Sequence, residues 1–231
     1  MDVLAMLLAD SRFPGGGHVH SGGLEEAAFR GLVRTEEDLP PFLTGRLRSA
    51  GALAAVFAAA AAHCALRGAA LWSTLDAELD ARTPSAAQRS ASRTQGRATA
   101  RAASVIPTVD NGCGSPLRDL LAATPRPHHA VVLGAVVGAG GGAPEDAALA
   151  AGYLSVSGPA SAAVRLLGLD PLRVNGIVAA LAPVLRAVAA DAAASAALDP
   201  SVLPAPGAPG LDLLAEEHGR HHREEVRLFA S

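Results

Sequence analysis

The sequence of 231 residues contains no lysine, because all 19 of its basic residues are arginine. This absence excludes a Schiff-base lysine and the phosphate-binding lysine of a P-loop, so the chain is not a standard nucleoside triphosphatase. Aromatic residues make up only 3%, while alanine is the most frequent residue. Such small side chains favour close-packed helices, since strands are enriched in β-branched and aromatic residues. With no alternating strand pattern in view, we predict an all-α fold.

The sequence also has little net charge and few cysteines. A formal charge of −3 provides no long-range attraction for nucleic acid or an anionic membrane, and we expect neither as a partner. Cys64 and Cys113 lack metal-ligand spacing and no signal peptide precedes them, which indicates reduced thiols in a cytoplasmic protein; a disulfide between them is the minor alternative. The uncharged segment 49–66 is mostly alanine and contains His63. It is too weakly apolar for a membrane span, so a buried helix is expected.

Half of the residues are apolar, which is enough for one helical domain over residues 1–210. Residues 198–210 hold four prolines and read as an extended linker to a charged tail, residues 211–231. We expect a single-domain bundle of about eight to ten helices. Asp38 is the expected N-cap of a long helix, residues 106–127 should be mostly loop, and Pro183 should bend the last helix of the domain. The expected helices cover about residues 2–9, 24–32, 39–66, 71–80, 84–104, 128–139, 144–156 and 159–168, with another from 171.

A loop rich in glycine follows the first helix. Pro14 and the three glycines after it forbid a continuing helix, so the chain must form a shaped loop before residue 24. Gly16 and Gly17 are expected to provide backbone freedom that a residue with a Cβ would lose. The loop also carries two histidines, His18 and His20, for which loop shaping or partner contact is favoured over metal ligation.

The histidines carry the clearest chemical signal, because imidazole suits nickel, zinc and copper. If the tail is helical, four of its side chains share one face that could hold a divalent ion: His218, His221, His222 and Glu225. A solvated polar face is the favoured alternative. The competing class of function is therefore a helical metalloenzyme or metal-binding protein, which would need three or more ligands that converge in a cavity, and hydrogen-bond partners that hold the imidazoles in place.

Other patterns with possible chemistry are weaker. Arg89, Arg93, Arg97 and Arg101 recur every four residues and indicate either a surface for phosphate or an acidic partner, or a solvated helix face. Residues 138–142 are rich in glycine but lack a preceding strand and a lysine, so they are not a phosphate loop. No nucleophile elbow or zinc-protease motif is present. We therefore identify no catalytic residues.

Four blocks of the sequence resemble the urease accessory protein UreF family. Residues 8–25 match its N-terminal signature through Pro14, Gly16, Gly17, Ser21, Gly23, Leu24 and Glu25. Arg89, Ser92 and Gly96 match its arginine, alanine-serine and glycine-arginine helix, and residues 162–166 match its alanine-rich helix. The C-terminal block comprises His218 with Arg227, Leu228, Phe229 and Ser231. The sequence departs from the family at His18 and His20, usually aromatic, at Ala87, often glutamate, and in the turn 168–176.

The resemblance implies an all-helical homodimer without catalytic activity. It would bridge a UreD/UreH-like protein and a UreG-like GTPase, and so regulate GTP-dependent insertion of nickel into the urease apoprotein. No cofactor would be bound tightly, since nickel is handled by the complex. Partner binding would fall to His20, His218, Arg227, Leu228, Phe229 and Ser231, whereas the other matched residues would be structural. We expect the tail to be mobile or loosely docked until Leu228 and Phe229 are buried against the UreD-like partner.

Overall fold

The computed structural model describes residues 2–17, 20–68, 71–109 and 114–229, the last eight of these by their backbone only. These ranges contain helices and no strand, so the predicted all-α class is confirmed. Besides the 3₁₀-helices η2 and η4 and the π-helix η3, the helices are α1 Val3–Ala9, α2 Leu24–Phe29, α3 Leu39–Arg46, α4 Ala52–Arg67, α5 Trp72–Ala81, α6 Ala86–Ala103, α7 Pro116–Ala123, α8 His129–Ala139, α9 Pro144–Leu167, α10 Pro171–Ala180, α11 Ala182–Ser195 and α12 Pro209–Phe229.

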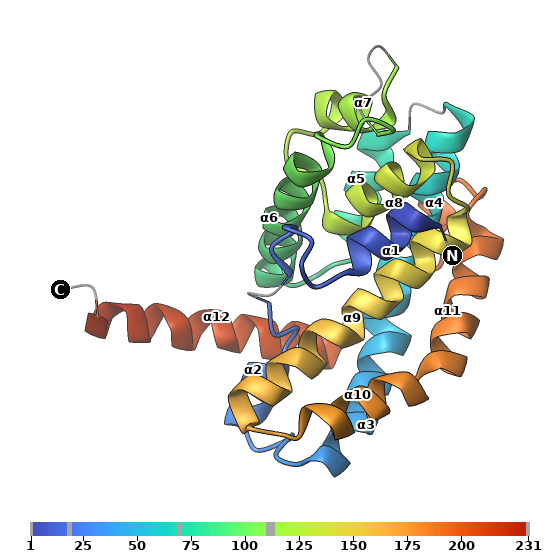
Figure 1. The fold of residues 1–231 in the computed structure, drawn as a ribbon. Coiled ribbons are helices and arrows are strands. Elements are labelled where there is room, and N and C mark those ends of the chain that lie inside the picture. The colour runs from blue at the N-terminus through green and yellow to red at the C-terminus, as the bar shows by residue number, and fades with distance from the viewer. Residues whose placement is uncertain (1, 18–19, 69–70, 110–113, 230–231) are drawn as a thin grey trace.

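Helix α4 is the centre of the molecule and packs against α8, α9 and α11 (Figure 1). Its alanine-rich surface is buried on nearly all sides. A Cβ added to Gly134 of α8 would lie 2.1 Å from the carbonyl oxygen of Ala58, so the two backbones approach too closely for any side chain. Alanine and glycine therefore allow the tight helix packing that the composition predicted, with dispersion contacts in place of bulky side chains.

The long helix expected after Asp38 begins three residues earlier. Residues Glu36–Arg67 form one helical stretch of 32 residues, which passes through η2 (Glu36–Asp38), α3, η3 (Leu47–Gly51) and α4. Asp38 does not act as its N-cap. Its carboxylate instead accepts hydrogen bonds from the backbone N–H groups of Arg34 (2.8 Å) and Thr35 (3.0 Å), which holds the entering chain against the first turn.

Pro159 does not start a new helix, contrary to our prediction. Helix α9 continues through it from Pro144 to Leu167. Proline lacks the N–H that would bond the Ser155 carbonyl four residues earlier. The guanidinium Nε of Arg46 donates to that carbonyl at 2.7 Å and replaces the missing backbone hydrogen bond. A side chain from a distant part of the sequence therefore supplies the hydrogen bond that α9 lacks at Pro159.

Two further predictions concern the bend near Pro183 and residues 106–127, and only the second was wrong. The bend predicted near Pro183 is confirmed: α10 and α11 meet at Leu181 with an angle of 44°. Residues 106–127, predicted to be mostly loop, contain α7, which begins at Pro116 and packs against α8. Proline at this first helical position favours helix formation, which explains the error. Cys113 lies outside the described residues, and Cys64 is a buried free thiol.

Two helical stretches, Glu36–Arg67 and Pro144–Leu167, are long and apolar enough to cross a membrane by length and composition. The bent pair α10 and α11 would be a third if counted as one span. However, 61% and 56% of the two apolar windows are buried inside the molecule, where α4 and α9 pack against each other. Their apolar faces are thus used by the protein core.

Candidate partner-binding site

The glycine loop places α2 against the body of the molecule. Gly16, Gly22 and Gly23 have φ values of 75°, 63° and 91°, in the left-handed region that favours glycine. Gly17 does not, so the backbone freedom predicted for it is not used; its constraint is space, because a Cβ there would lie 3.1 Å from the Gln95 side-chain nitrogen. Pro14 is exposed, and Ser21 lies in the turn that leads to α2.

The first turn of α2 separates two adjacent glutamates. Leu24 is fully buried, Glu25 is exposed, and Glu26 is 2% exposed. Oε1 of Glu26 accepts a hydrogen bond from Arg30 Nε at 2.8 Å, and its Oε2 lies 3.1 Å from His221 Nδ1 of α12. Burial would raise the pKa of Glu26, but these hydrogen bonds outweigh it and hold the pKa below its ordinary value. Glu26 is therefore a buried carboxylate that joins α2 to α12.

Helix α12 docks on α2 through a row of charged contacts. His218 Nε2 lies 3.8 Å from Glu25 Oε2, and Arg30 Nη2 lies 3.3 Å from Glu217 Oε2. We call the six residues of these contacts the α2–α12 clasp: Glu25, Glu26, Arg30, Glu217, His218 and His221. The clasp docks residues 211–221 on α2, and the mobility or loose docking expected for the tail in the free protein stays a prediction.

The same helix caps the N-terminus of α6. Glu216 accepts hydrogen bonds from Ser85 Oγ at 2.7 Å and from the backbone N–H of Ala87 at 2.9 Å. Glu216 thus places a carboxylate from α12 at the positive end of α6, which is a stabilising position for a negative charge. Asp212 adds a contact by accepting from Gln88 Nε2 at 3.0 Å.

Apolar side chains remain exposed beside the clasp. Phe29 is 76% exposed and its ring centroid lies 5.1 Å from that of His221, while Leu32 and Leu213 are also exposed. Helix α12 then projects sideways from the bundle toward the C-terminus (Figure 1). The backbone of Arg227, Leu228 and Phe229 continues this helix, but their side chains, like the whole of Ser231, lie outside what the structure describes. An exposed apolar surface next to a projecting helix is typical of a protein-binding site.

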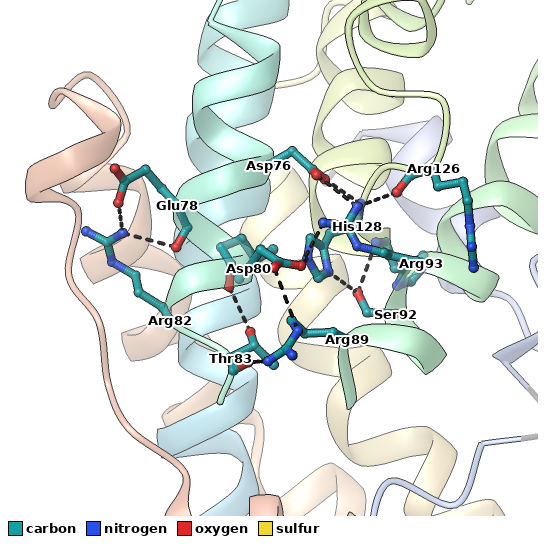
Figure 2. A network of polar contacts seen from close by, with 12 residues as sticks. Asp76, Glu78, Asp80, Arg82, Thr83, Arg89, Ser92, Arg93, Arg126 and His128 are labelled. Carbon is teal, nitrogen blue, oxygen red and sulfur yellow. Dashed lines mark hydrogen bonds and ion pairs between the residues drawn. The ribbon is translucent and has the colours of Figure 1, made fainter. Parts of the chain in front are cut away.

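A second polar cluster joins α5, α6 and α8 (Figure 2). Arg93 donates to Asp76 Oδ2 at 2.9 Å and to Asp80 Oδ1 at 2.7 Å. His128 Nε2 lies 3.0 Å from Asp80, and its Nδ1 lies 3.0 Å from Ser92 Oγ. Asp76 Oδ1 accepts the backbone N–H of His128 at 2.7 Å, as a cap for α8. The predicted arginine row is thus divided, because Arg93 turns inward.

The remaining three arginines of the row have different surroundings. Arg89 donates to the backbone carbonyls of Thr83 and Pro84 and lies 3.7 Å from Asp80, whereas Arg97 and Arg101 are exposed. Gly96 is buried where a Cβ would lie 2.2 Å from the Pro127 carbonyl oxygen. The row is therefore neither a continuous anion-binding surface nor a fully solvated face.

The order Ser92–His128–Asp80 has the connectivity of a hydrolase triad, but its electrostatics favour a structural role. Asp80 shares its charge with Arg93, and burial lowers the pKa of His128 below its ordinary value. A lowered pKa leaves this imidazole neutral but makes it a weaker base than one whose pKa lies near neutral pH. Ser92 Oγ also accepts the backbone N–H of His129 at 3.2 Å, which holds the hydroxyl against the start of α8. We read the cluster as the polar joint of three helices.

The histidines do not converge on one point. The described residues contain no group of three or more His, Cys, Asp and Glu side chains that could hold a metal ion. His20 and His218 border a common cavity, and burial lowers the pKa of His129 to about 4, so that its imidazole is neutral at physiological pH. His18 and the side chains of His222 and Glu225 lie outside the described residues. The metalloprotein alternative therefore gains no support from the part of the chain that is placed.

The UreF family model matches residues 33–182, which is more than half of the chain. The chain belongs to the UreF family. It is 46% identical over 227 residues to the urease accessory protein UreF of Mycolicibacterium vanbaalenii, covering 98% of this chain and 97% of the relative. The corresponding proteins of Mycobacterium marinum and Mycobacterium tuberculosis are 43% and 42% identical over the full length of both chains. These matches confirm the family that the sequence blocks suggested.

Some residues that shape this UreF-family site were missed. Arg46 and Asp76 were not singled out, although Arg46 bonds two backbone carbonyls and Asp76 is 4% exposed. A lone acidic residue within a short helix gives no warning that it will be buried. Glu26 offered one signal, since it falls between the apolar positions Leu24 and Ala27 that pack into the core.

Proposed function

We propose that this UreF-family chain is a non-enzymatic adaptor in urease maturation. It bridges a UreD/UreH-like protein and a UreG-like GTPase, and regulates GTP-dependent insertion of nickel into the urease apoprotein. The observation that carries the proposal is 42–46% identity to urease accessory proteins UreF over almost the whole chain. The lysine-free sequence, which lacks a P-loop, supports the view that the GTPase is a separate protein.

The site supports binding as the mode of action. Phe29, Leu32 and Leu213 present exposed apolar surface on α2, after it and on α12, next to the α2–α12 clasp. Apolar anchors ringed by charged groups are the usual composition of a protein–protein interface. The adaptor acts in the cytoplasm as a homodimer and carries no tightly bound cofactor, because nickel is held by the assembled complex.

Reconstitution tests this proposal. The chain is co-expressed with the UreD-like and UreG-like proteins of the same organism, and the purified assembly is analysed by native mass spectrometry. We expect a complex that contains all three proteins with two copies of this chain, and nickel- and GTP-dependent activation of apo-urease only when the chain is present. Equal urease activation without the chain would contradict the adaptor function. A monomer at micromolar concentration, both alone and in the complex, would contradict the homodimer.

Metal analysis separates the adaptor from the competing metalloprotein. The purified chain is dialysed against metal-free buffer and its nickel, zinc and copper contents are measured. The adaptor predicts a folded protein with less than stoichiometric metal. One tightly held metal ion per chain, whose removal unfolds the protein, would instead support a metalloprotein.

A further inference from the structure

A cavity of about 320 Å³ lies beneath α12. Leu211 and Ala215 of α12 border it on one side. Residues of α3, α4, α6, α8 and α9 form much of the remaining wall, together with the glycine loop, the start of α2 and the end of α5. Leu53 and Leu154 contribute apolar surface, and Arg46 contributes a guanidinium group. Its volume is at the lower end of the range for small-molecule sites, which begins at about 300 Å³.

Arg46 is held rigidly at the wall of this cavity. Its Nε donates to the Ser155 carbonyl at 2.7 Å, and its Nη1 donates to the Gly22 carbonyl at 2.6 Å. The Ser155 carbonyl is available because Pro159 has no N–H, and Gly22 leaves room because a Cβ there would lie 2.8 Å from Arg46 Cζ. Two backbone groups from separate elements thus fix the plane of the guanidinium without neutralising its charge.

The charge of Arg46 has no counter-ion in the described part of the chain. No carboxylate lies within the 4.0 Å of an ion pair, and Nη2 has no hydrogen-bond acceptor there. The other charged groups of the wall have partners of their own: Arg82 pairs with Glu78, Glu25 with His218, and Asp212 with Gln88. Burial lowers the pKa of Arg46 to about 10, and no carboxylate contributes to that shift. Arg46 is half-buried, and a cation in such a place is stabilised by a counter-ion, which an anion bound in the cavity would supply.

We propose that this cavity binds a small monocarboxylate, with its carboxylate on Arg46 and its short alkyl chain against the leucines of the wall. A fixed guanidinium with unused N–H donors matches the planar geometry of a carboxylate. The apolar remainder of the wall accepts a chain of a few carbons, as in other sites where few polar groups orient a ligand. The proposed carboxylate site is independent of the adaptor function, which the reconstitution experiment tests separately.

The test uses the full chain and 4,4,4-trifluorobutyrate, followed by ¹⁹F NMR at constant ionic strength with sodium chloride. We expect saturable broadening of the fluorine signal with the unaltered protein. Arg46→Gln should weaken binding at least tenfold, while Arg97→Gln, an exposed arginine of α6, should leave it unchanged. The neutral analogue 4,4,4-trifluorobutanol should bind at least tenfold more weakly than the carboxylate, because it lacks the charge that Arg46 recognises.

A second variant protects the test against misfolding of Arg46→Gln. Ala215→Leu fills the cavity from α12 without altering either backbone hydrogen bond of Arg46, and it should also abolish saturable binding. The circular dichroism spectrum of each variant confirms that it is folded. Absence of saturable binding to the unaltered chain, equal binding of the alcohol, or undiminished binding by Ala215→Leu would each overturn the proposal.

Discussion

Arg93 shows how one long polar side chain can position helices whose buried surfaces consist mostly of alanine. It reaches two carboxylates of α5 and, through Nη1, the backbone carbonyl of Arg126. Asp76, 4% exposed, depends on this arginine for its charge balance, since its other oxygen caps α8. Small apolar side chains provide few lateral restraints between helices, so the polar joint sets the relative positions of α5, α6 and α8.

Replacing Arg93 with methionine should destabilise the protein. The flexible thioether fills most of the volume but leaves Asp76 buried without a positive partner. We expect the free energy of unfolding to fall by about 2–3 kcal/mol, less than the 3–5 kcal/mol typical of a sealed pair, because Arg93 remains partly exposed. Urea denaturation measures the change. The exposed Arg97→Met on the same helix should lie within about 0.5 kcal/mol of the unaltered protein; equal losses for both variants would refute the role of Arg93.

Replacing glycine with alanine should change the stability of the protein in opposite directions at two positions within helices. Gly96→Ala would place a Cβ 2.2 Å from the Pro127 carbonyl oxygen, and we expect a loss of about 1–3 kcal/mol from overpacking. Gly45 in α3 has no atom within 4 Å of the same position, so Gly45→Ala should stabilise the protein by about 0.5–1 kcal/mol through helix propensity. Thermal and urea unfolding measure the change in stability of each variant. Changes of the same sign would show that the close approach of the Pro127 carbonyl does not account for the need for glycine at position 96.

At the scale of the helices, the sequence was informative where neighbours along the chain decide the structure. The apolar stripe of α4, the end of α1 before the glycine loop and the break near Pro183 depend on spacing and on proline within a few residues. The continuation of α9 through Pro159 could not be predicted in this way. It depends on Arg46, which lies 109 residues from the carbonyl that it bonds. The cap of α8 by Asp76 likewise spans 52 residues.

The same reasoning explains which contacts of the candidate site could not be predicted from the sequence. The family signature pointed to Glu25 and His218, which the fold brings within 3.8 Å of each other. Glu26 is the buried member of the clasp because its position on α2 faces α12 rather than solvent. Adjacent glutamates look alike in a sequence, and only the docking of another helix makes one of them a buried anion.

Docking of α12 should depend on the charge of Glu26. The pKa of this carboxyl is lowered in the folded protein, so its ionised form stabilises the clasp above the ordinary value of 4.5, and this stabilisation is lost as pH falls through the lowered value. Glu26→Gln should remove it at every pH. We expect faster amide hydrogen exchange across residues 212–221 in this variant at neutral pH, measured by mass spectrometry.

The matched control for that measurement is Glu145→Gln, an exposed carboxylate in the first turn of α9. It should leave exchange in α12 unchanged, and exchange in α4 should remain slow in both variants. If residues 212–221 exchange as slowly in Glu26→Gln as in the unaltered chain, ionic contacts do not hold α12, and the packing of Leu214 against the apolar cluster of Leu24 and Ala27 would account for the docking.

At the scale of the whole molecule, α12 connects the helical body with the surface proposed for partners. Its described contacts end at His221, and its backbone continues as a helix to Phe229. The described contacts that fix the helix to α2 and α6 are made by residues 212–221. The sequence after residue 221 contains an apolar pair, Leu228 and Phe229, in an otherwise mostly charged segment.

Removing residues 227–231 should leave the fold intact but prevent assembly with the UreD-like protein. Because the clasp and the cap of α6 remain, we expect the free energy of unfolding to change by less than about 0.5 kcal/mol. Full burial of one leucine or phenylalanine is worth roughly 1.5–3 kcal/mol, so loss of both should weaken binding of the UreD-like protein at least a hundredfold and prevent urease activation. The double substitution Leu228→Ser and Phe229→Ser should reproduce the loss, whereas Arg223→Gln should not. Assembly at unaltered affinity would exclude the terminal pair from the interface, and a large fall in melting temperature would show that it stabilises the chain itself.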